Sequence, residues 1–290
     1  MTRPDVIASM SKLKAALLAG FAALLSACAP TGLINLLVPR GGYAVHRGIA
    51  YGADPRQKLD IYVPDGLTAP APVLLFFYGG SWEGGERGQY LAFGQAFASA
   101  GVVTVVADYR LYPKVRWPAF VADAAGAVAL LHKNIARYGG DPGRIFVSGH
   151  SAGAYNAVML ASDPRYLKAV GGDFSWIRGV IGIAGPYDFL PLKDADLVDI
   201  FGGENNREIL PIVHVDGLRP PMLLLHGTAD TIVGPQNTKS MAYVLKTHGS
   251  AVEKIYYRDV GHIGIILSLL PGFRWKAPLR ADMLAFIHAH

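Results

Sequence analysis

A serine stands at the centre of a G-x-S-x-G pattern formed by residues Gly149–Gly153. The apolar run Ile145–Ser148 precedes it and a helix-like run follows, so the pattern is expected at a tight turn from a buried strand into a helix. Such a turn strains the serine and projects its Oγ at the carboxyl edge of the sheet. The residues two before and two after the serine crowd one another, so both must be small. The pattern predicts nucleophilic attack by Ser151, and a passive glycine-rich turn is the alternative.

A serine hydroxyl needs a base, and the base needs an acid that orients it. In this architecture the chain order is serine, acid and histidine, each on a loop after a later strand. Asp230 follows the strand-like run Met222–Leu225, and His262 follows the run Lys254–Tyr257. Both therefore lie at the same sheet edge as the serine, and we predict a Ser151–His262–Asp230 triad.

Other acids and histidines fit these roles less well. Asp259 shares the loop of His262, where it is expected to brace the loop, and Asp216 lies in an irregular segment. His226 stands at a strand end and is expected to be a hydrogen-bonded structural histidine. His150 lies inside the turn, where lining the pocket or packing fits better than proton transfer.

Glycines after another predicted strand supply hydrogen-bond donors. The run Val73–Phe77 leads into Tyr78-Gly79-Gly80-Ser81-Trp82. Glycine lets the backbone come close to a substrate, so the N–H groups of Gly79, Gly80 and Ala152 are predicted to form an oxyanion hole. No G-K-[ST] follows and G-x-G-x-x-G is absent, which disfavours a phosphate-binding loop.

Contacts with substrate are predicted from position alone for three residues: Trp82, His150 and Tyr187. The apolar run Ile263–Phe273 follows the predicted base directly. It could line an acyl pocket, but a core helix is the favoured interpretation. The pattern predicts no metal and no organic cofactor.

Hydrophobic patterning predicts the elements that position these residues. The expected strands are Leu59–Val63, Val73–Phe77, Val102–Asp108, Ile145–Ser148, Val180–Ala184, Met222–Leu225 and Lys254–Tyr257. The expected helices are Tyr90–Ser99, Ala119–Tyr138, Ala152–Ala161, Gln236–Thr247 and Pro278–His288. This alternation predicts a three-layer α/β/α sandwich with a mostly parallel sheet. The segment Tyr187–Pro221 interrupts it and predicts a small cap, with a plain surface excursion as the alternative.

The N-terminus is typical of an export signal. Basic residues precede the apolar run Ala15–Leu25, and small residues follow it. Eleven apolar residues are too few to cross a hydrocarbon core, which needs about 20. Leu25-Ser26-Ala27-Cys28 resembles the bacterial lipobox, so Cys28 is predicted to carry lipid; ordinary cleavage and an uncleaved anchor are the alternatives.

These patterns divide the chain into a signal peptide over residues 1–27, a tether over 28–45 and a catalytic domain over 46–290. Lipid on Cys28 would anchor the mature protein to a membrane without spanning it. Ala29 after the cysteine resembles lipoproteins sent to the bacterial outer membrane, so an exported, membrane-anchored protein is expected.

Composition excludes several other classes of protein. The 290 residues are 51% hydrophobic and 17% charged, which is too apolar for a disordered chain. The net charge is +5 without a basic run, which disfavours nucleic-acid binding. Cys28 is the chain's one cysteine, so neither an internal disulfide nor a multi-cysteine zinc site can form.

From Lys58 to the C-terminus the sequence resembles the α/β-hydrolase superfamily, and within it the carboxylesterases related to hormone-sensitive lipase. The motifs are YGGSW, DYRLYP, GGDPGRIFVSGHSAGA, HGTAD and GH, in that order. The resemblance implies the fold, the triad and the oxyanion donors named above. One departure is that Tyr78 and Ser81 stand where the family has the His and third Gly of HGGGW, which puts substrate preference in doubt. Kynurenine formamidases and secreted feruloyl or acetylxylan esterases are similar over the same motifs.

We therefore predict a serine hydrolase that cleaves small carboxylic esters through an acyl-enzyme. The alternatives on the same scaffold are an arylformamidase or amidase and a peptide hydrolase. A hydrolase fold that has lost catalysis and only binds is the alternative from another class.

Overall fold

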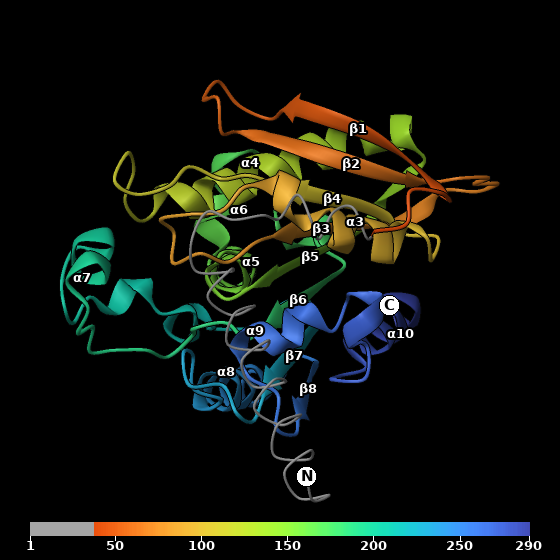
Figure 1. The fold of residues 1–290 in the computed structure, drawn as a ribbon. Coiled ribbons are helices and arrows are strands. Elements are labelled where there is room, and N and C mark those ends of the chain that lie inside the picture. The colour runs from red at the N-terminus through yellow and green to blue at the C-terminus, as the bar shows by residue number, and fades with distance from the viewer. Residues whose placement is uncertain (1–37) are drawn as a thin grey trace, which may run out of the picture. The chain divides into compact units, whose positions relative to one another are not determined.

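The computed structural model describes residues 38–290, so the predicted signal peptide and Cys28 lie outside the described residues. An eight-stranded sheet runs in the order β1-β2-β4-β3-β5-β6-β7-β8 (Figure 1). The strands are β1 (Tyr43–Ala50), β2 (Lys58–Pro64), β3 (Ala71–Phe77), β4 (Val103–Ala107), β5 (Gly140–His150), β6 (Gly179–Ile183), β7 (Met222–Gly227) and β8 (Val252–Tyr257). The β1–β2 and β2–β4 pairs are antiparallel and the others are parallel.

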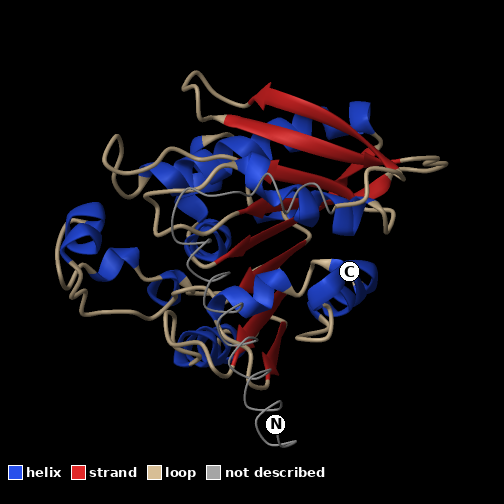
Figure 2. Ribbon diagram, in the orientation of Figure 1, coloured by secondary structure: helices blue, strands red, loops and turns tan. Residues whose placement is uncertain are grey.

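Helices cover both faces of this sheet (Figure 2). They are α3 (Leu91–Ala98), α4 (Ala119–Asn134), α5 (Ala152–Ser162), α6 (Pro164–Ala169), α7 (Ala195–Phe201), α8 (Gln236–Thr247), α9 (His262–Leu267) and α10 (Leu279–Ala289). Helices α3 and α10 contact each other on one face, and α4 and α5 contact each other on the other face. These layers confirm the predicted α/β sandwich with the α/β-hydrolase strand arrangement. No helix of the described residues has the length and apolarity that a membrane crossing requires.

The central strands are buried along their whole length. Every residue of β3, β4, β6 and β7 is buried, as expected for strands with helices on both faces. Their mostly apolar sequences, rich in Val, Ile, Leu and Phe, were therefore sufficient to predict them. Because β3 to β8 are parallel, the loops that follow β3, β5, β7 and β8 leave the sheet at one edge, and these are the loops that carry the predicted site.

Strand β1 was not predicted from the sequence. Its residues, YAVHRGIA, are mostly exposed or half-buried, so they show no clean alternation. The register also shifts between His46 and Ile49, where the strand pairs with β2. The sheet therefore begins at Tyr43, three residues before the boundary at residue 46 that the sequence suggested.

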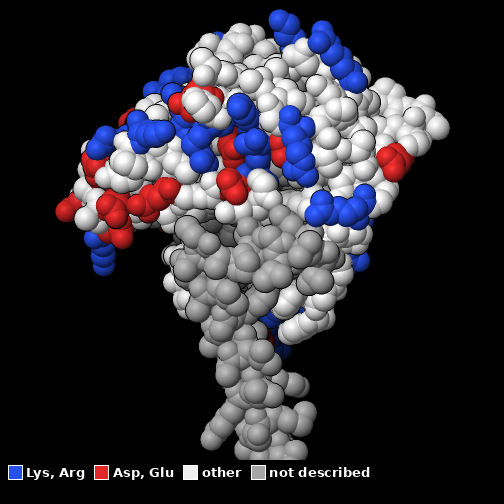
Figure 3. All heavy atoms as spheres, turned by 45° about the horizontal axis from the view of Figure 1, so that its top comes forward, with Lys and Arg blue, Asp and Glu red and all other residues white. Residues whose placement is uncertain are grey.

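The insertion Tyr187–Pro221 is folded and contains α7. Its buried side packs on the domain through Phe201, whose ring contacts those of Trp82 and Tyr155. Asp199 of α7 also forms a salt bridge with Arg116. Acidic side chains gather over α7 in the space-filling view, while Lys and Arg lie across the rest of the face that is drawn with a few Asp and Glu among them (Figure 3). The segment that the sequence predicted as a cap is therefore a folded element packed on the domain.

Candidate active site

Ser151 lies at the turn between β5 and α5 with φ 55° and ψ −122°, which is a strained conformation for a residue with a side chain. Its N–H donates to the carbonyl of Ile183 at 2.9 Å, which fixes the turn against β6. The two glycines are obligatory. A Cβ on Gly149 would lie 2.2 Å from the carbonyl of Gly153, and a Cβ on Gly153 would lie 2.0 Å from the carbonyl oxygen of Phe77. The turn therefore has the geometry of a nucleophile elbow.

The structure brings Asp230 and His262 together. His262 Nδ1 lies 2.7 Å from Asp230 Oδ2, and both residues are buried. The other carboxylate oxygen, Oδ1, accepts from the N–H groups of Ile232 at 3.0 Å and Val233 at 2.9 Å. Because both oxygens are held, the carboxylate has a fixed direction and presents Oδ2 to the imidazole.

His226 contacts Asp230. From the sequence, His226 was expected only to be a hydrogen-bonded structural histidine. Its Nε2 lies 2.8 Å from the carbonyl of Val233 and 3.3 Å from Asp230 Oδ2, while Nδ1 lies 2.8 Å from the Thr238 hydroxyl. A carbonyl can only accept, so we assign the proton to Nε2. Burial raises the pKa of Asp230, but hydrogen bonds from His226, His262 and the Val233 amide outweigh it and hold the pKa below its usual range. Asp230 is therefore a carboxylate at neutral pH.

His150 fixes the backbone of the predicted base. Its Nε2 lies 3.0 Å from the carbonyl of His262 and so carries the proton, and the two imidazole rings lie 4.7 Å apart. Burial and the nearby His262 lower the pKa of His150 to about 3. Since His150 neighbours Ser151 in the chain, this contact brings the His262 loop against the elbow.

The neutral, buried His150 predicts acid sensitivity. The unfolded chain binds a proton at this residue below a pH of about 6.5, whereas the folded protein does not until a pH of about 3. The free energy of unfolding should therefore fall as the pH is lowered through this window, by up to about 1.4 kcal/mol per pH unit. Asp230 adds a loss of the same sign only below about pH 4, so its contribution falls outside the range from pH 6.5 to 4.5.

Urea titrations in that range measure the slope. His150→Gln keeps a donor for the His262 carbonyl but has no titrating ring, so its stability should depend less on pH than that of the wild type. His248→Gln, at an exposed histidine, should keep the wild-type slope. An unchanged slope in His150→Gln would contradict the neutral, buried state of this ring.

Two of the predicted oxyanion donors, Gly79 and Ala152, adjoin the serine. A Cβ on Gly79 would lie 2.9 Å from Ser151 Cβ, so this glycine lies against the nucleophile. Ala152 is the first residue of α5, where a helix leaves N–H groups free and carries positive partial charge. Within the part of the chain that the structure describes, the N–H groups of Gly79, Gly80 and Ala152 donate no hydrogen bond. They remain available to an oxyanion.

All three residues predicted to contact substrate, Trp82, His150 and Tyr187, have buried side chains. Trp82 is 3% exposed, and its Nε1 donates to Asn156 Oδ1 at 3.0 Å. Tyr187 is also fully buried, and its N–H donates to Asn237 Oδ1 at 2.8 Å. These surroundings favour anchoring roles for both residues over the predicted substrate contacts. Ile263, in contrast, directly follows the base on α9 and is 40% exposed, so the apolar run is not simply a core helix.

The rival acids lie outside the cluster. Asp216 is exposed and pairs with Arg219, and Asp259 is exposed and pairs with Arg258. No group of three or more His, Cys, Asp or Glu side chains among residues 38–290 is arranged to hold a metal ion.

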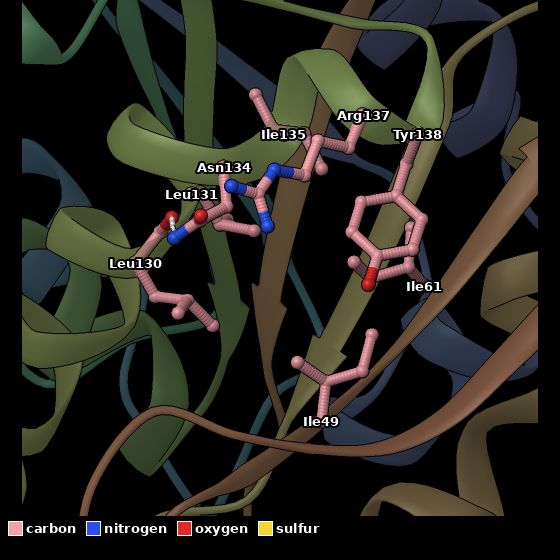
Figure 4. A pocket seen from close by; sticks show the side chains of 8 residues that line it. All are labelled: Ile49, Ile61, Leu130, Leu131, Asn134, Ile135, Arg137 and Tyr138. Atoms are coloured by element: carbon pink, nitrogen blue, oxygen red, sulfur yellow. Dashed lines mark hydrogen bonds between the residues drawn. The ribbon is translucent and has the colours of Figure 1, made fainter.

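A cavity of about 220 Å³ lies elsewhere, between β1, β2 and the end of α4 (Figure 4). Its lining includes Ile49, Leu131 and Tyr138. The chain passes from there directly into the start of β5, whereas Ser151 follows the end of that strand. This cavity is therefore not part of the candidate active site.

The profile of the BD-FAE family matches residues 59–245, well over half of the chain. The chain belongs to the BD-FAE family. The match includes Ser151, Asp230, Gly79 and Gly80, and it ends before His262.

Relatives of this family member include esterases. A probable isoprenylcysteine alpha-carbonyl methylesterase, ICMEL1 of Arabidopsis thaliana, is 31% identical over 246 residues, covering 77% of this chain and 52% of the relative. Esterase LipC of Mycobacterium tuberculosis is 32% identical over 269 residues, covering 86% of this chain and 66% of the relative. The chain thus spans about half to two thirds of the length of these curated relatives.

Solved structures share the fold. A thermophilic esterase from Thermogutta terrifontis, Est2 with propionate bound, has a TM-score of 0.69 and 25% identity, covering 86% of this chain and 96% of that one. A truncated carbohydrate esterase from gut microbiota has a TM-score of 0.75 and 21% identity, covering 87% of this chain and 98% of that one. The second likeness supports the fold alone.

Proposed function

We propose that the protein is a serine hydrolase of carboxylic esters. The observation that carries this proposal is the 2.7 Å pair of His262 Nδ1 and Asp230 Oδ2 at the sheet edge that also carries the strained Ser151. The esterase relatives support the same chemistry. Ser151 Oγ attacks the carbonyl carbon of the ester while His262 Nε2 takes the hydroxyl proton.

The intermediate places negative charge on the former carbonyl oxygen. The N–H groups of Gly79, Gly80 and Ala152 stabilise this charge, and His262 then gives its proton to the departing alcohol. Water activated by His262 next attacks the acyl-enzyme, which releases the acid and returns the proton to Ser151. Asp230 keeps the imidazole proton on Nδ1 throughout, so that Nε2 is free to accept.

Two exposed apolar residues adjoin the acid and the base. Ile232 is 68% exposed and follows Asp230 by two positions, and Ile263 is 40% exposed beside His262. An acyl or alcohol group that covers such residues gains about 0.8 kcal/mol per buried methylene. We therefore expect kcat/KM to rise by up to about tenfold from a p-nitrophenyl acetate to the butanoate.

A screen of p-nitrophenyl esters of graded acyl length, run beside a methyl ester and an aryl formamide, tests the proposal. The methyl ester is included because several relatives are named methylesterases. Hydrolysis of the esters is expected, with the formamide slower. Turnover of the formamide alone would replace the proposal by formamidase chemistry, and no turnover of any of these compounds would overturn it.

We also propose that residues 1–27 form a signal peptide and that lipid on Cys28 anchors the mature protein to a membrane. The support is the lipobox-like run Leu25–Cys28. Radiolabelled fatty acid should enter the wild type and not Cys28→Ala. An unlabelled wild-type protein would contradict the anchor.

A further inference from the structure

A group of polar side chains forms hydrogen bonds with residues 78–85, which we call the oxyanion loop. The proposed reaction does not use these side chains. Tyr78 and Tyr109 are fully buried, and their rings stack with centroids 5.0 Å apart. Arg56 reaches them from the loop between β1 and β2. We call Arg56, Tyr78 and Tyr109 the loop clamp.

Hydrogen bonds join the clamp to both ends of the loop. Arg56 Nη2 donates to the Tyr78 hydroxyl and to the Gly85 carbonyl, each at 2.7 Å, and its Nε donates to the Tyr109 carbonyl at 2.9 Å. The Tyr78 hydroxyl in turn donates to Asp108 Oδ1 at 2.8 Å. Burial raises the pKa of Tyr78 far above its usual range, so this hydroxyl keeps its proton. One guanidinium thus ties the first and last residues of the loop together.

A further hydrogen bond fixes the peptide that carries a predicted oxyanion donor. The Tyr109 hydroxyl donates to the Tyr78 carbonyl oxygen at 2.9 Å. In a trans peptide the C=O of one residue and the N–H of the next point in opposite directions. Holding the Tyr78 carbonyl toward Tyr109 therefore directs the Gly79 N–H away from the clamp. Gly79 lies against Ser151, so this direction bears on the reacting centre.

We propose that the loop clamp sets the orientation of the Gly79 N–H, and that Arg56, Tyr78 and Tyr109 are positioning residues for oxyanion stabilisation. The inference rests on the proposed function and deepens it. It also accounts for Tyr78, which stands where the resembled esterases have histidine: its hydroxyl bridges Arg56 and Asp108 in one buried site.

Kinetics of Tyr109→Phe and Arg56→Lys test the proposal with p-nitrophenyl butanoate. Phenylalanine keeps the ring stack but frees the Tyr78 carbonyl. The single nitrogen of a lysine cannot stand at both the Nε and the Nη2 positions from which Arg56 bonds its three acceptors. We expect kcat to fall by at least about tenfold with KM within about twofold, because the affected donor acts on the transition state. The Ki of a trifluoromethyl ketone, which forms an oxyanion at the serine, should rise by the same factor as kcat/KM falls.

Tyr257→Phe is the matched control, because it also removes one hydrogen bond donated by a buried tyrosine hydroxyl, the 2.7 Å bond to Asp282 on α10. Its unfolding midpoint should fall by an amount similar to that of Tyr109→Phe while kcat stays within about twofold of the wild type. If Tyr109→Phe does not fold, the kinetics of Arg56→Lys test the proposal, because Arg56 is only half-buried. A kcat within twofold of the wild type in a folded clamp variant, or a loss confined to KM, would overturn the clamp. A wild type without ester turnover would instead refute the proposed function.

Discussion

Ser151→Ala is expected to abolish ester hydrolysis, with kcat falling by about 10⁶-fold to the level left by binding and the oxyanion hole. Alanine keeps the volume of the elbow and its hydrogen bond from the residue 151 N–H to Ile183, so the fold should persist. What disappears is the one oxygen that can form the acyl bond. Initial rates with p-nitrophenyl butanoate at enzyme concentrations high enough to detect residual turnover measure the loss.

Ser148→Ala is the matched control on the same strand. Ser148 is fully buried, and its Oγ has no hydrogen-bond partner in the part of the chain that the structure describes. Removing that hydroxyl breaks no hydrogen bond and should leave kcat unchanged. Turnover of Ser151→Ala within a hundredfold of the wild type would assign the nucleophile elsewhere.

Asp230→Asn is expected to lower kcat by about 10⁴-fold. The Asn oxygen can still accept from the N–H groups of Ile232 and Val233, which leaves its NH₂ group facing His262 Nδ1. An NH₂ group donates, so the imidazole must move its proton to Nε2, the atom that has to accept from Ser151. The variant therefore traps the wrong tautomer with little change in shape. Steady-state kinetics should show the loss in kcat.

Asp259→Asn separates this effect from a general loss of charge near the base. The Asp259 side chain is 86% exposed, and its φ of 57° is one that asparagine tolerates well. Its kcat should match the wild type within about twofold. Equal losses in Asp230→Asn and Asp259→Asn would mean that the acid has been misassigned.

The sequence was sufficient to place the central strands and the loops of the predicted triad. Strands β3 and β7 and the second half of β5 are mostly apolar and buried, so their ends were visible in the chain. Ser151, Asp230 and His262 each follow such an end or the end of β8. The short distance between Asp230 and His262 then follows from parallel strands that share one edge.

Other parts of the site depend on contacts between distant segments. Arg56 lies 22 residues before Tyr78 in a loop next to β1, an edge strand without a clear hydrophobic pattern. His226 contacts Asp230 only because the turn after β7 folds back on it. Trp82 was visible as an aromatic residue of the oxyanion loop, but its burial against Phe201 depends on how α7 docks. Such pairings leave no periodic signal in the sequence.

Mapping the residue that a fluorophosphonate modifies is the most direct test of the central claim, that Ser151 is the activated nucleophile. Peptide mass spectrometry of the inhibited wild-type protein should locate a single phosphonyl adduct on Ser151, formed in step with the loss of ester turnover. An adduct on another residue, or complete loss of turnover without modification of Ser151, would contradict the account.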